Sequence, residues 1–206
     1  MAQRPVSAAL ADYAANATVL VPRWLAIDPT DVHAPVLHLF PDKPSRILDI
    51  GAGVGRDAGW LAGLGHSVLA VEPVDGFREA GLAHHSRPGI EWLDDRLPEL
   101  ATVMAREETF DLVMLTAVWA HLDPDQRRIA MPNIAALLVV GGRLLMSIRN
   151  GWTPPSRPTF DAAPEETIAL AAAEGLSVIL HAQSDSIQPV NKANGVTWTR
   201  LAFEKR

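Results

Sequence analysis

Apolar positions change their spacing in a regular way from Arg46 to the end of the chain. Short apolar runs bounded by turn residues are typical of buried strands, and longer stretches of helical periodicity lie between them. We expect strands at residues 46–50, 67–72, 90–93, 110–116, 143–148, 176–183 and 195–204. We expect helices at residues 56–64, 75–83, 97–106, 124–138 and 164–174. Because strands that alternate with helices form parallel sheets covered on both faces, the pattern predicts a doubly wound α/β domain.

The two ends of the chain depart from this alternation. No helical pattern separates the last two strands, so they should pair antiparallel, which gives a seven-stranded, mostly parallel sheet with an antiparallel last strand. Residues 1–45 contain proline-interrupted helical stretches around 7–21 and 31–40, the second capped by Asp31 with Pro35 in its first turn. We interpret residues 1–45 as an N-terminal helical lid on a domain of residues 46–206, within one structural domain. The Pro-rich stretch 154–158 is expected to be a loop over a site.

Composition narrows the function classes. The 206 residues are 48% hydrophobic and 20% charged, as in an ordinary soluble domain, and the formal net charge is −6. That charge, without a Lys/Arg cluster, argues against a nucleic-acid partner. The chain has no cysteine, which excludes disulfides, thiolate metal sites and a Cys nucleophile. The seven histidines show no ligand spacing, since His84 and His85 would diverge on a helix, and we expect no metal.

Membrane and export signals are also weak. Polar residues interrupt the N-terminal apolar stretch at Asp12, Tyr13 and Asn16, unlike the core of a signal peptide. The longest apolar run, 134–140, is too short to span a bilayer. We expect a cytoplasmic protein without a membrane partner.

The most informative segment is residues 47–57, where a buried strand runs into a glycine-rich turn and then a helix. Glycine permits the positive φ angles of such a turn and lets a ligand approach the backbone, and helix-start amides attract electron-rich groups. Glu72 ends the next strand about twenty residues later, where an acid in nucleotide-binding sheets accepts hydrogen bonds from ribose hydroxyls. The combination predicts an adenosine-type ligand.

The glycine spacing separates the candidate cofactors. A dinucleotide fingerprint needs a third glycine where Arg56 stands, and no Gly-Lys-Ser/Thr of a P-loop follows. The pattern is Asp-x-Gly-x-Gly-x-Gly, starting at Asp49. With the acid at Glu72, this part of the sequence resembles class I S-adenosylmethionine-dependent methyltransferases. The resemblance covers roughly residues 46–206, including the last strand, which in this family inserts antiparallel beside the sixth.

The resemblance implies S-adenosylmethionine as the cofactor, with S-adenosylhomocysteine as the product, and implies where the cofactor would bind. Its amino-acid end belongs to the glycine loop, its ribose to Glu72, and its adenine lies near an acid after the third strand, Asp94 being favoured over Asp95. The implied cofactor residues are Asp49, Gly51, Ala52, Gly53, Gly55, Arg56, Glu72, Pro73, Asp94, Asp95, Thr116 and Trp119.

The segment after the fourth strand would face the methyl acceptor. Trp119 either packs near the sulfonium through a cation–π contact or belongs to the core. His121 either acts as the catalytic base or only orients the loop and the next helix. Direct displacement can proceed by positioning alone, so a base is not obligatory.

Four further residues are candidates for contact with the acceptor: Tyr13, Arg149, Trp152 and Arg157. Either arginine could bind an acidic acceptor bidentately or make a surface ion pair. Tyr13 is a lid residue or an ordinary packing residue.

Absent motifs narrow the reaction. Adenine or glutamine amino methylation would need an Asn/Asp-Pro-Pro-Tyr/Phe motif, and covalent pyrimidine methylation would need Cys. We expect a methyltransferase acting on a small acidic or neutral molecule. One alternative is a non-catalytic module that binds S-adenosylmethionine. The other, a nicotinamide-dependent oxidoreductase, would need glycine at position 56 and a catalytic tyrosine, and Tyr13 is the only tyrosine.

Overall fold

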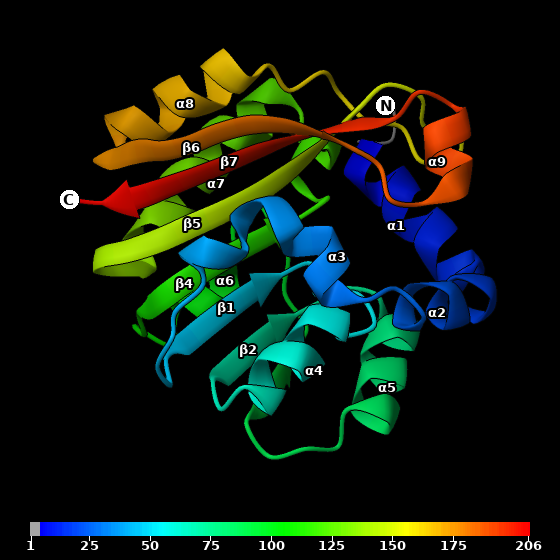
Figure 1. The fold of residues 1–206 in the computed structure, drawn as a ribbon, viewed down its shortest axis with the longest axis horizontal. Coiled ribbons are helices and arrows are strands. Elements are labelled where there is room, and N and C mark those ends of the chain that lie inside the picture. The colour runs from blue at the N-terminus through cyan, green and yellow to red at the C-terminus, as the bar shows by residue number, and fades with distance from the viewer. Residues whose placement is uncertain (1–4) are drawn as a thin grey trace.

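A single seven-stranded sheet forms the centre of the molecule in the computed structural model, which describes residues 5–206 (Figure 1). The strands are β1 (Arg46–Ile50), β2 (Ser67–Val71), β3 (Ile90–Leu93), β4 (Phe110–Thr116), β5 (Leu138–Asn150), β6 (Leu176–Asp185) and β7 (Thr197–Lys205). Their order is β3-β2-β1-β4-β5-β7-β6, and only β7 is antiparallel to its neighbours. This confirms the predicted fold class, with β7 inserted between β5 and β6.

Helices cover both faces of the sheet. They are α1 (Pro5–Ala15), α2 (Ala17–Leu25), α3 (Pro29–His33), the 3₁₀ helix η1 (Ala34–Leu39), α4 (Arg56–Gly63), α5 (Asp75–His84), α6 (Ala101–Met104), the 3₁₀ turn η2 (Trp119–His121), α7 (Pro124–Ala136), α8 (Pro164–Ala173) and α9 (Pro189–Ala193). None of these helices, within residues 5–206, combines the length and apolar character that crossing a bilayer requires.

Alternation along each strand divides the core into two layers. On β1, Leu48 packs with α6, α7 and α8 on one face, and Ile47 packs with α4 and η1 on the other. Burial of both faces explains why the parallel strands read as nearly continuous apolar runs.

The N-terminal segment differs from the prediction. The helix expected over 7–21 is two helices, α1 and α2, separated at Asn16. The second helix begins at Pro29 and its cap is Asp28, whose side chain accepts the Thr30 amide, so Asp31 is not the cap. From Ala34 the chain continues as η1.

Three further boundaries moved. Only Ala101–Met104 of the expected helix 97–106 is α-helical, and Asp95 accepts the amides of Thr102 and Val103 at its start. Strand β5 begins at Leu138, because that residue pairs with Phe110 of β4. The loop before β7 contains the short helix α9.

The parallel strands point toward α1 and α2, which lie across their carboxyl ends (Figure 1). Leu20 of α2 packs with Val54, Val74 and Phe77, joined by Tyr13 and other residues of both helices. The N-terminal helices therefore cover the edge where α/β sheets bind ligands.

Candidate active site

The glycine turn after β1 is hydrogen-bonded to the end of the neighbouring strand β2. The amides of Gly51 and Ala52 both donate to the carbonyl of Val71, at 2.8 and 3.0 Å. Gly51 has φ +75°, and a Cβ there would overlap the Val118 side chain. A larger residue would push the turn away from the segment after β4, so glycine keeps these two loops in contact.

Gly55 has a different role, which the sequence did not reveal. It precedes α4 with φ +74°, and a Cβ would lie 2.6 Å from the Trp92 ring of β3. Gly81 of α5 is packed against the same ring. The last glycine of the motif therefore lets α4 and α5 close around a tryptophan.

Glu72 links the loop after β1 to the loop after β2. Its Oε2 accepts the Gly53 amide and its Oε1 accepts the Val74 amide, both at 2.8 Å. Burial is the main cause that raises the pKa of Glu72 to about 7, against the lowering effect of these amides. Each carboxylate oxygen keeps a second lone pair, which a ribose hydroxyl could use.

Asp49 is a buried acid whose carboxylate is only partly satisfied by the protein. It is 1% exposed, and its Oδ2 has no hydrogen-bond partner in the part of the chain that the structure describes. Burial first, and then the neighbouring Asp57, raises the pKa of Asp49 well above its usual range. A buried, unpartnered carboxylate oxygen is costly unless a donor or cation meets it. The ammonium end of S-adenosylmethionine fits this requirement.

A pocket of about 640 Å³ opens between α1 and the loops after β2 and β3. Its lining includes Pro73, Asp94 and Asp95. The oxygens of Asp95 accept the amides of residues 96, 102 and 103, whereas the Asp94 side chain is 66% exposed. The size suits an adenosine-sized group. Asp94, whose Oδ1 lies 3.5 Å from the Arg78 guanidinium, is the more exposed of the two acids and so the better placed to contact such a group.

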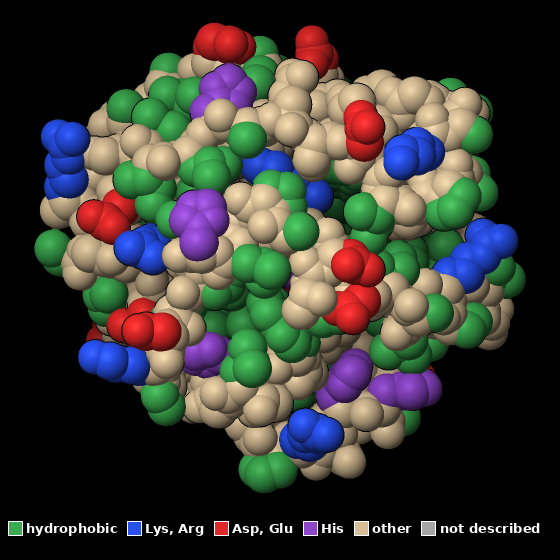
Figure 2. Space-filling model, viewed as in Figure 1, with side chains coloured by type: hydrophobic (Ala, Val, Ile, Leu, Met, Phe, Trp, Pro, Cys, Tyr) green, Lys and Arg blue, Asp and Glu red, His purple; other side chains and the backbone are tan. Residues whose placement is uncertain are grey.

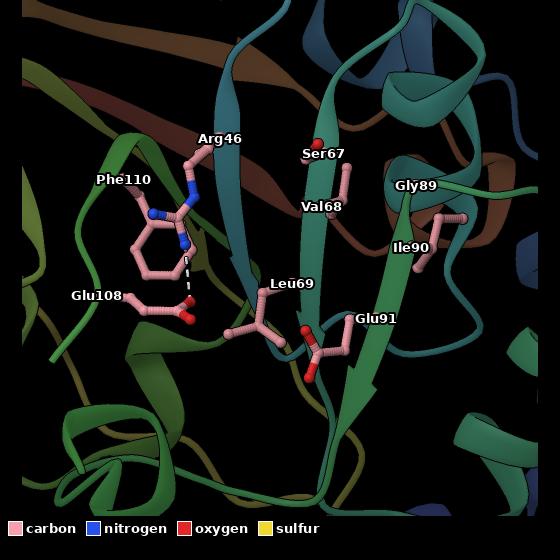
Figure 3. Close-up of a pocket in the computed structure, with 9 residues that line it drawn as sticks. All are labelled: Arg46, Ser67, Val68, Leu69, Gly89, Ile90, Glu91, Glu108 and Phe110. Carbon is pink, nitrogen blue, oxygen red and sulfur yellow. Dashed lines mark hydrogen bonds and ion pairs between the residues drawn. The ribbon is translucent and has the colours of Figure 1, made fainter. Parts of the chain in front are cut away.

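A smaller pocket of about 270 Å³ lies at the opposite edge of the sheet (Figure 3). It is lined by residues at the amino ends of β1 to β4, with Arg46 paired to Glu108 at 2.7 Å. Ligands of open α/β sheets bind beyond the carboxyl ends, so we do not assign this pocket to the site.

Tyr13 and His121 come from distant parts of the chain and meet at the carboxyl edge. The Tyr13 Oη lies 3.1 Å from His121 Nε2, and His121 Nδ1 lies 3.5 Å from the Pro158 carbonyl. Burial is the largest cause that lowers the pKa of His121, and burial also raises the pKa of Tyr13. Since a carbonyl can only accept, Nδ1 carries the hydrogen and Nε2 accepts from the tyrosine hydroxyl.

The acceptor candidates after β5 are held by other parts of the protein. Arg149 donates to the Trp152 carbonyl at 2.8 and 3.1 Å and to Asn191 Oδ1 at 3.0 Å. Arg157 forms an ion pair with Asp12 of α1 and lies 5.1 Å from the Tyr13 ring centroid. Trp152 is 47% exposed. Loop 151–163 is thus anchored both to the sheet and to α1.

Trp119 is a core residue, not a wall of the cofactor site. It is fully buried, and its indole N–H donates to Thr167 of α8 at 3.0 Å. The η2 turn directs the ring into the layer that contains α7 and α8, which explains the difference from the sequence prediction. Thr116, at the end of β4, is half-buried.

A buried ionic cluster beside the glycine loop was missed. Arg56 binds Asp57 with two hydrogen bonds of 2.8 and 2.9 Å, and His33 Nε2 lies 3.0 Å from the same carboxylate. Arg56 is therefore held by a carboxylate of its own helix. The only signal in the sequence was an acid in the first turn of α4, which is ordinary for a helix start. Among the described residues, no group of three or more His, Cys, Asp or Glu side chains could hold a metal.

Comparisons with known proteins agree with this geometry. Residues 48–146 match the family described as "Methyltransferase domain". An uncharacterized methyltransferase of Mycobacterium tuberculosis is 28% identical over 113 residues, covering 52% of this chain and 40% of that protein. A ubiquinone biosynthesis O-methyltransferase of Dinoroseobacter shibae is 34% identical over 111 residues, covering 53% and 43%. The chain thus matches about two fifths of the length of these relatives.

Solved structures extend the likeness to nearly the whole chain. A TehB-like S-adenosylmethionine-dependent methyltransferase of Corynebacterium glutamicum has a TM-score of 0.68 at 22% identity, covering 93% of this chain and 99% of that one. The 1,6-didemethyltoxoflavin-N1-methyltransferase of Burkholderia thailandensis, solved with S-adenosylhomocysteine, has a TM-score of 0.73 at 20% identity, covering 100% and 91%. These neighbours show the fold. Residues 48–146 match the methyltransferase-domain family, and the chain has the fold of these methyltransferases, which confirms the resemblance seen in the sequence.

Proposed function

We propose that this protein transfers a methyl group from S-adenosylmethionine to a small molecule. One observation carries the proposal: the glycine turn that follows Asp49 and the Tyr13 ring of the Tyr13–His121 pair both lie against Trp24 of α2. Trp24 connects them, because it would meet a Cβ on Gly53 at 3.7 Å and packs against the Tyr13 ring at 5.8 Å. A cofactor subsite and a proton-accepting group therefore share one covered edge.

Each residue has a defined task in this proposal. S-adenosylmethionine supplies an electrophilic methyl group on a sulfonium. Asp49 would hold the ammonium end of that cofactor, Glu72 the ribose and Asp94 the adenosine pocket. The acceptor loses a proton on methylation; the Tyr13 hydroxyl would take up that proton as it passes its own to Nε2 of the neutral His121 imidazole.

Tyr13 and the lid supply position and exclusion of water. The Tyr13 hydroxyl holds His121 Nε2 toward the lid, and Pro158 fixes the tautomer through Nδ1. We further propose that residues 1–45 act as a lid that opens for exchange of the cofactor and the acceptor, with Arg157 and Asp12 joining it to loop 151–163. Positioning under a closed lid contributes to the rate of a direct displacement.

Calorimetric titration with S-adenosylmethionine, S-adenosylhomocysteine and NADH tests the cofactor assignment. We expect the first two to bind, NADH to give no signal, and Asp49→Asn to weaken binding at least tenfold. The matched control is Asp42→Asn, an exposed acid that precedes β1 at the opposite edge of the sheet. Binding of NADH alone would overturn the proposal.

A transfer assay with labelled cofactor tests the acceptor class. Small acids, phenols and amines are compared with nucleic acid and protein, and label in only the latter two would contradict a small-molecule acceptor. For an acceptor found in this way, His121→Gln should lower kcat about 10²-fold or more and remove the acidic limb of its pH profile, with cofactor affinity unchanged. Tight cofactor binding without transfer to any acceptor would instead support a binding module.

A further inference from the structure

A polar row crosses three strands close to the candidate site. Register pairs Thr116 of β4 with Ser147 of β5, and Ser147 with Arg200 of β7. Paired residues point to the same side of a sheet, so all three share the face that carries α4 and η1. Ser147 also accepts the Ala117 amide at 3.1 Å, which places this row directly beside the segment after β4.

Arg200 is a buried cation without a carboxylate of its own. It is only 5% exposed, and its guanidinium donates to Ser184 Oγ at 3.3 Å. Across residues 5–206, no acid forms an ion pair with it. Burial, and then the positive charge of Arg56, lowers the pKa of Arg200 to about 10.

The neighbouring charges leave this region positive. The negative charge of Asp57 raises the pKa of Arg200, but the Asp57 carboxylate already contacts Arg56 and His33. The Trp198 ring lies between two cations, with Arg149 5.7 Å and Arg200 5.8 Å from its centroid. Figure 2 shows basic side chains set back in a hollow on this face, between the region of α3 and the strands β6 and β7.

A buried, unpaired guanidinium costs stability, because it has lost water without gaining a counter-charge. Such a group is well suited to an oxyanion, which it can bind with two parallel hydrogen bonds. Three strand spacings, about 14 Å, separate β7 from β1. An arginine side chain and a small molecule can together span that distance to the glycine loop.

We propose that Arg200 binds an anionic oxygen group, a carboxylate or a phosphate ester, on the methyl acceptor, with Ser147 and Ser184 as hydroxyl partners. This inference rests on the proposed methyltransferase function. It moves the acid-binding role away from Arg149 and Arg157, whose guanidinium groups already have protein partners.

The test titrates the protein saturated with S-adenosylhomocysteine with benzoate, phenyl phosphate and the uncharged benzamide. We expect the anions to bind at least tenfold tighter than benzamide, and the tighter anion identifies the acidic group. Arg200→Met should abolish that preference, and Arg200→Lys should retain part of it. The control is Arg143→Met, which removes a cation from the same face of β5 that is already paired with Glu204.

Stability gives a second, independent readout. Because Arg200 is buried without a counter-ion, Arg200→Met should melt at the same temperature as the wild type or higher. The inference is overturned if Arg200→Met keeps the preference for anions, if benzamide binds as tightly as benzoate, or if both Arg200 variants fail to fold. Failure of the wild type to bind S-adenosylhomocysteine would instead contradict the proposed function, and anion binding by the unliganded protein can then be measured separately.

Discussion

At the scale of single residues, two buried carboxylates lie at the carboxyl edge of the sheet, where the proposed cofactor would bind. Asp49 and Glu72 end neighbouring parallel strands, where burial favours their protonated forms. Glu72 is compensated by two amides, whereas one oxygen of Asp49 is not. The uncompensated group should contribute most to ligand binding, and the compensated group should respond most clearly to pH.

Glu72 makes the stability depend on pH in a predictable direction. Its pKa rises from an ordinary 4.5 to about 7 on folding, so the folded state holds the proton more tightly than the unfolded state. Its contribution to stability is therefore complete below about pH 4.5 and is lost as the pH rises through 7. Between pH 5 and 8, the melting temperature of the wild type should fall by several degrees relative to Glu72→Gln.

Melting curves at half-unit pH steps check this prediction. Glu79→Gln, which changes an exposed acid on α5, should follow the wild type throughout. Parallel curves for the wild type and Glu72→Gln would show that this carboxyl keeps its ordinary pKa in the folded protein.

Single residues also show where sequence reasoning stopped. Asp49 and Glu72 were found because an acid at the end of an apolar run is a local feature. Arg200 was not, because it lies inside a strand, and its unpaired state depends on contacts with β6 and α4. Trp119 was given two readings, and only packing against Thr167 of α8, far along the chain, decided between them.

At the scale of elements, the start of α4 depends on one ring of β3. Gly55 and Gly65 flank α4 and both have positive φ, +74° and +93°. A Cβ at Gly55 would lie 2.6 Å from Trp92, whereas nothing lies within 4 Å of a Cβ at Gly65. Both positions therefore need a residue that tolerates a positive φ, but only position 55 lacks space for a Cβ.

Alanine substitutions at these two glycines separate strain from overlap. Gly65→Ala should cost about 1 to 2 kcal/mol in the free energy of unfolding, the usual cost of a left-handed alanine. Gly55→Ala should cost about 2 kcal/mol more, because the Trp92 ring must move. Urea unfolding measures both, and adding Trp92→Leu should recover part of the second loss. Equal costs at the two sites would refute the packing role of Gly55.

Element boundaries were predictable where the local pattern was unambiguous. β1, β3 and β4 begin and end where predicted, since each apolar run meets polar or glycine residues. The start of β5 was not, because residues 138–140 continue the helical pattern of α7. Pairing of Leu138 with Phe110, a contact between distant segments, assigns them to the strand.

Helix α1 is joined to loop 151–163 by a partly buried ion pair. The side chains of Arg157 and Asp12 are 23% and 13% exposed, and Tyr13 lies beside them. Removing one partner leaves the other charge partly buried, so each single change should loosen α1. We expect Asp12→Asn and Arg157→Met to speed proteolysis of residues 5–25 several-fold. The double variant should add little, and additive effects would mean that the two residues act separately.

At the scale of the whole molecule, the net charge conceals an uneven distribution. The chain carries a formal charge of −6, yet three arginines, Arg56, Arg149 and Arg200, gather around Trp198 and the start of α4, beside the buried acids Asp49 and Asp57. The alternation of strands and helices predicted the sheet, and the family resemblance predicted the place of β7. Neither could predict this charged hollow or the packing of α1 and α2, because both depend on contacts between segments that are distant in the sequence.

In the proposed function, α1 and α2, the glycine loop and Glu72 form one ligand site. A ligand bound there should therefore stabilise all of these parts together. A ligand that binds only the folded state adds RT ln(1 + [L]/Kd), about 2.7 kcal/mol at a hundredfold excess over Kd. S-adenosylhomocysteine should therefore raise the melting temperature by several degrees and slow proteolysis of α1 and α2 in parallel. At the same ligand concentration, Asp49→Asn should lose about half of both effects or more, because its affinity is at least tenfold weaker. Asp12→Asn should keep the thermal shift and lose part of the protection. A thermal shift without protection of α1 and α2 would place the ligand outside the lid and separate cofactor binding from lid closure.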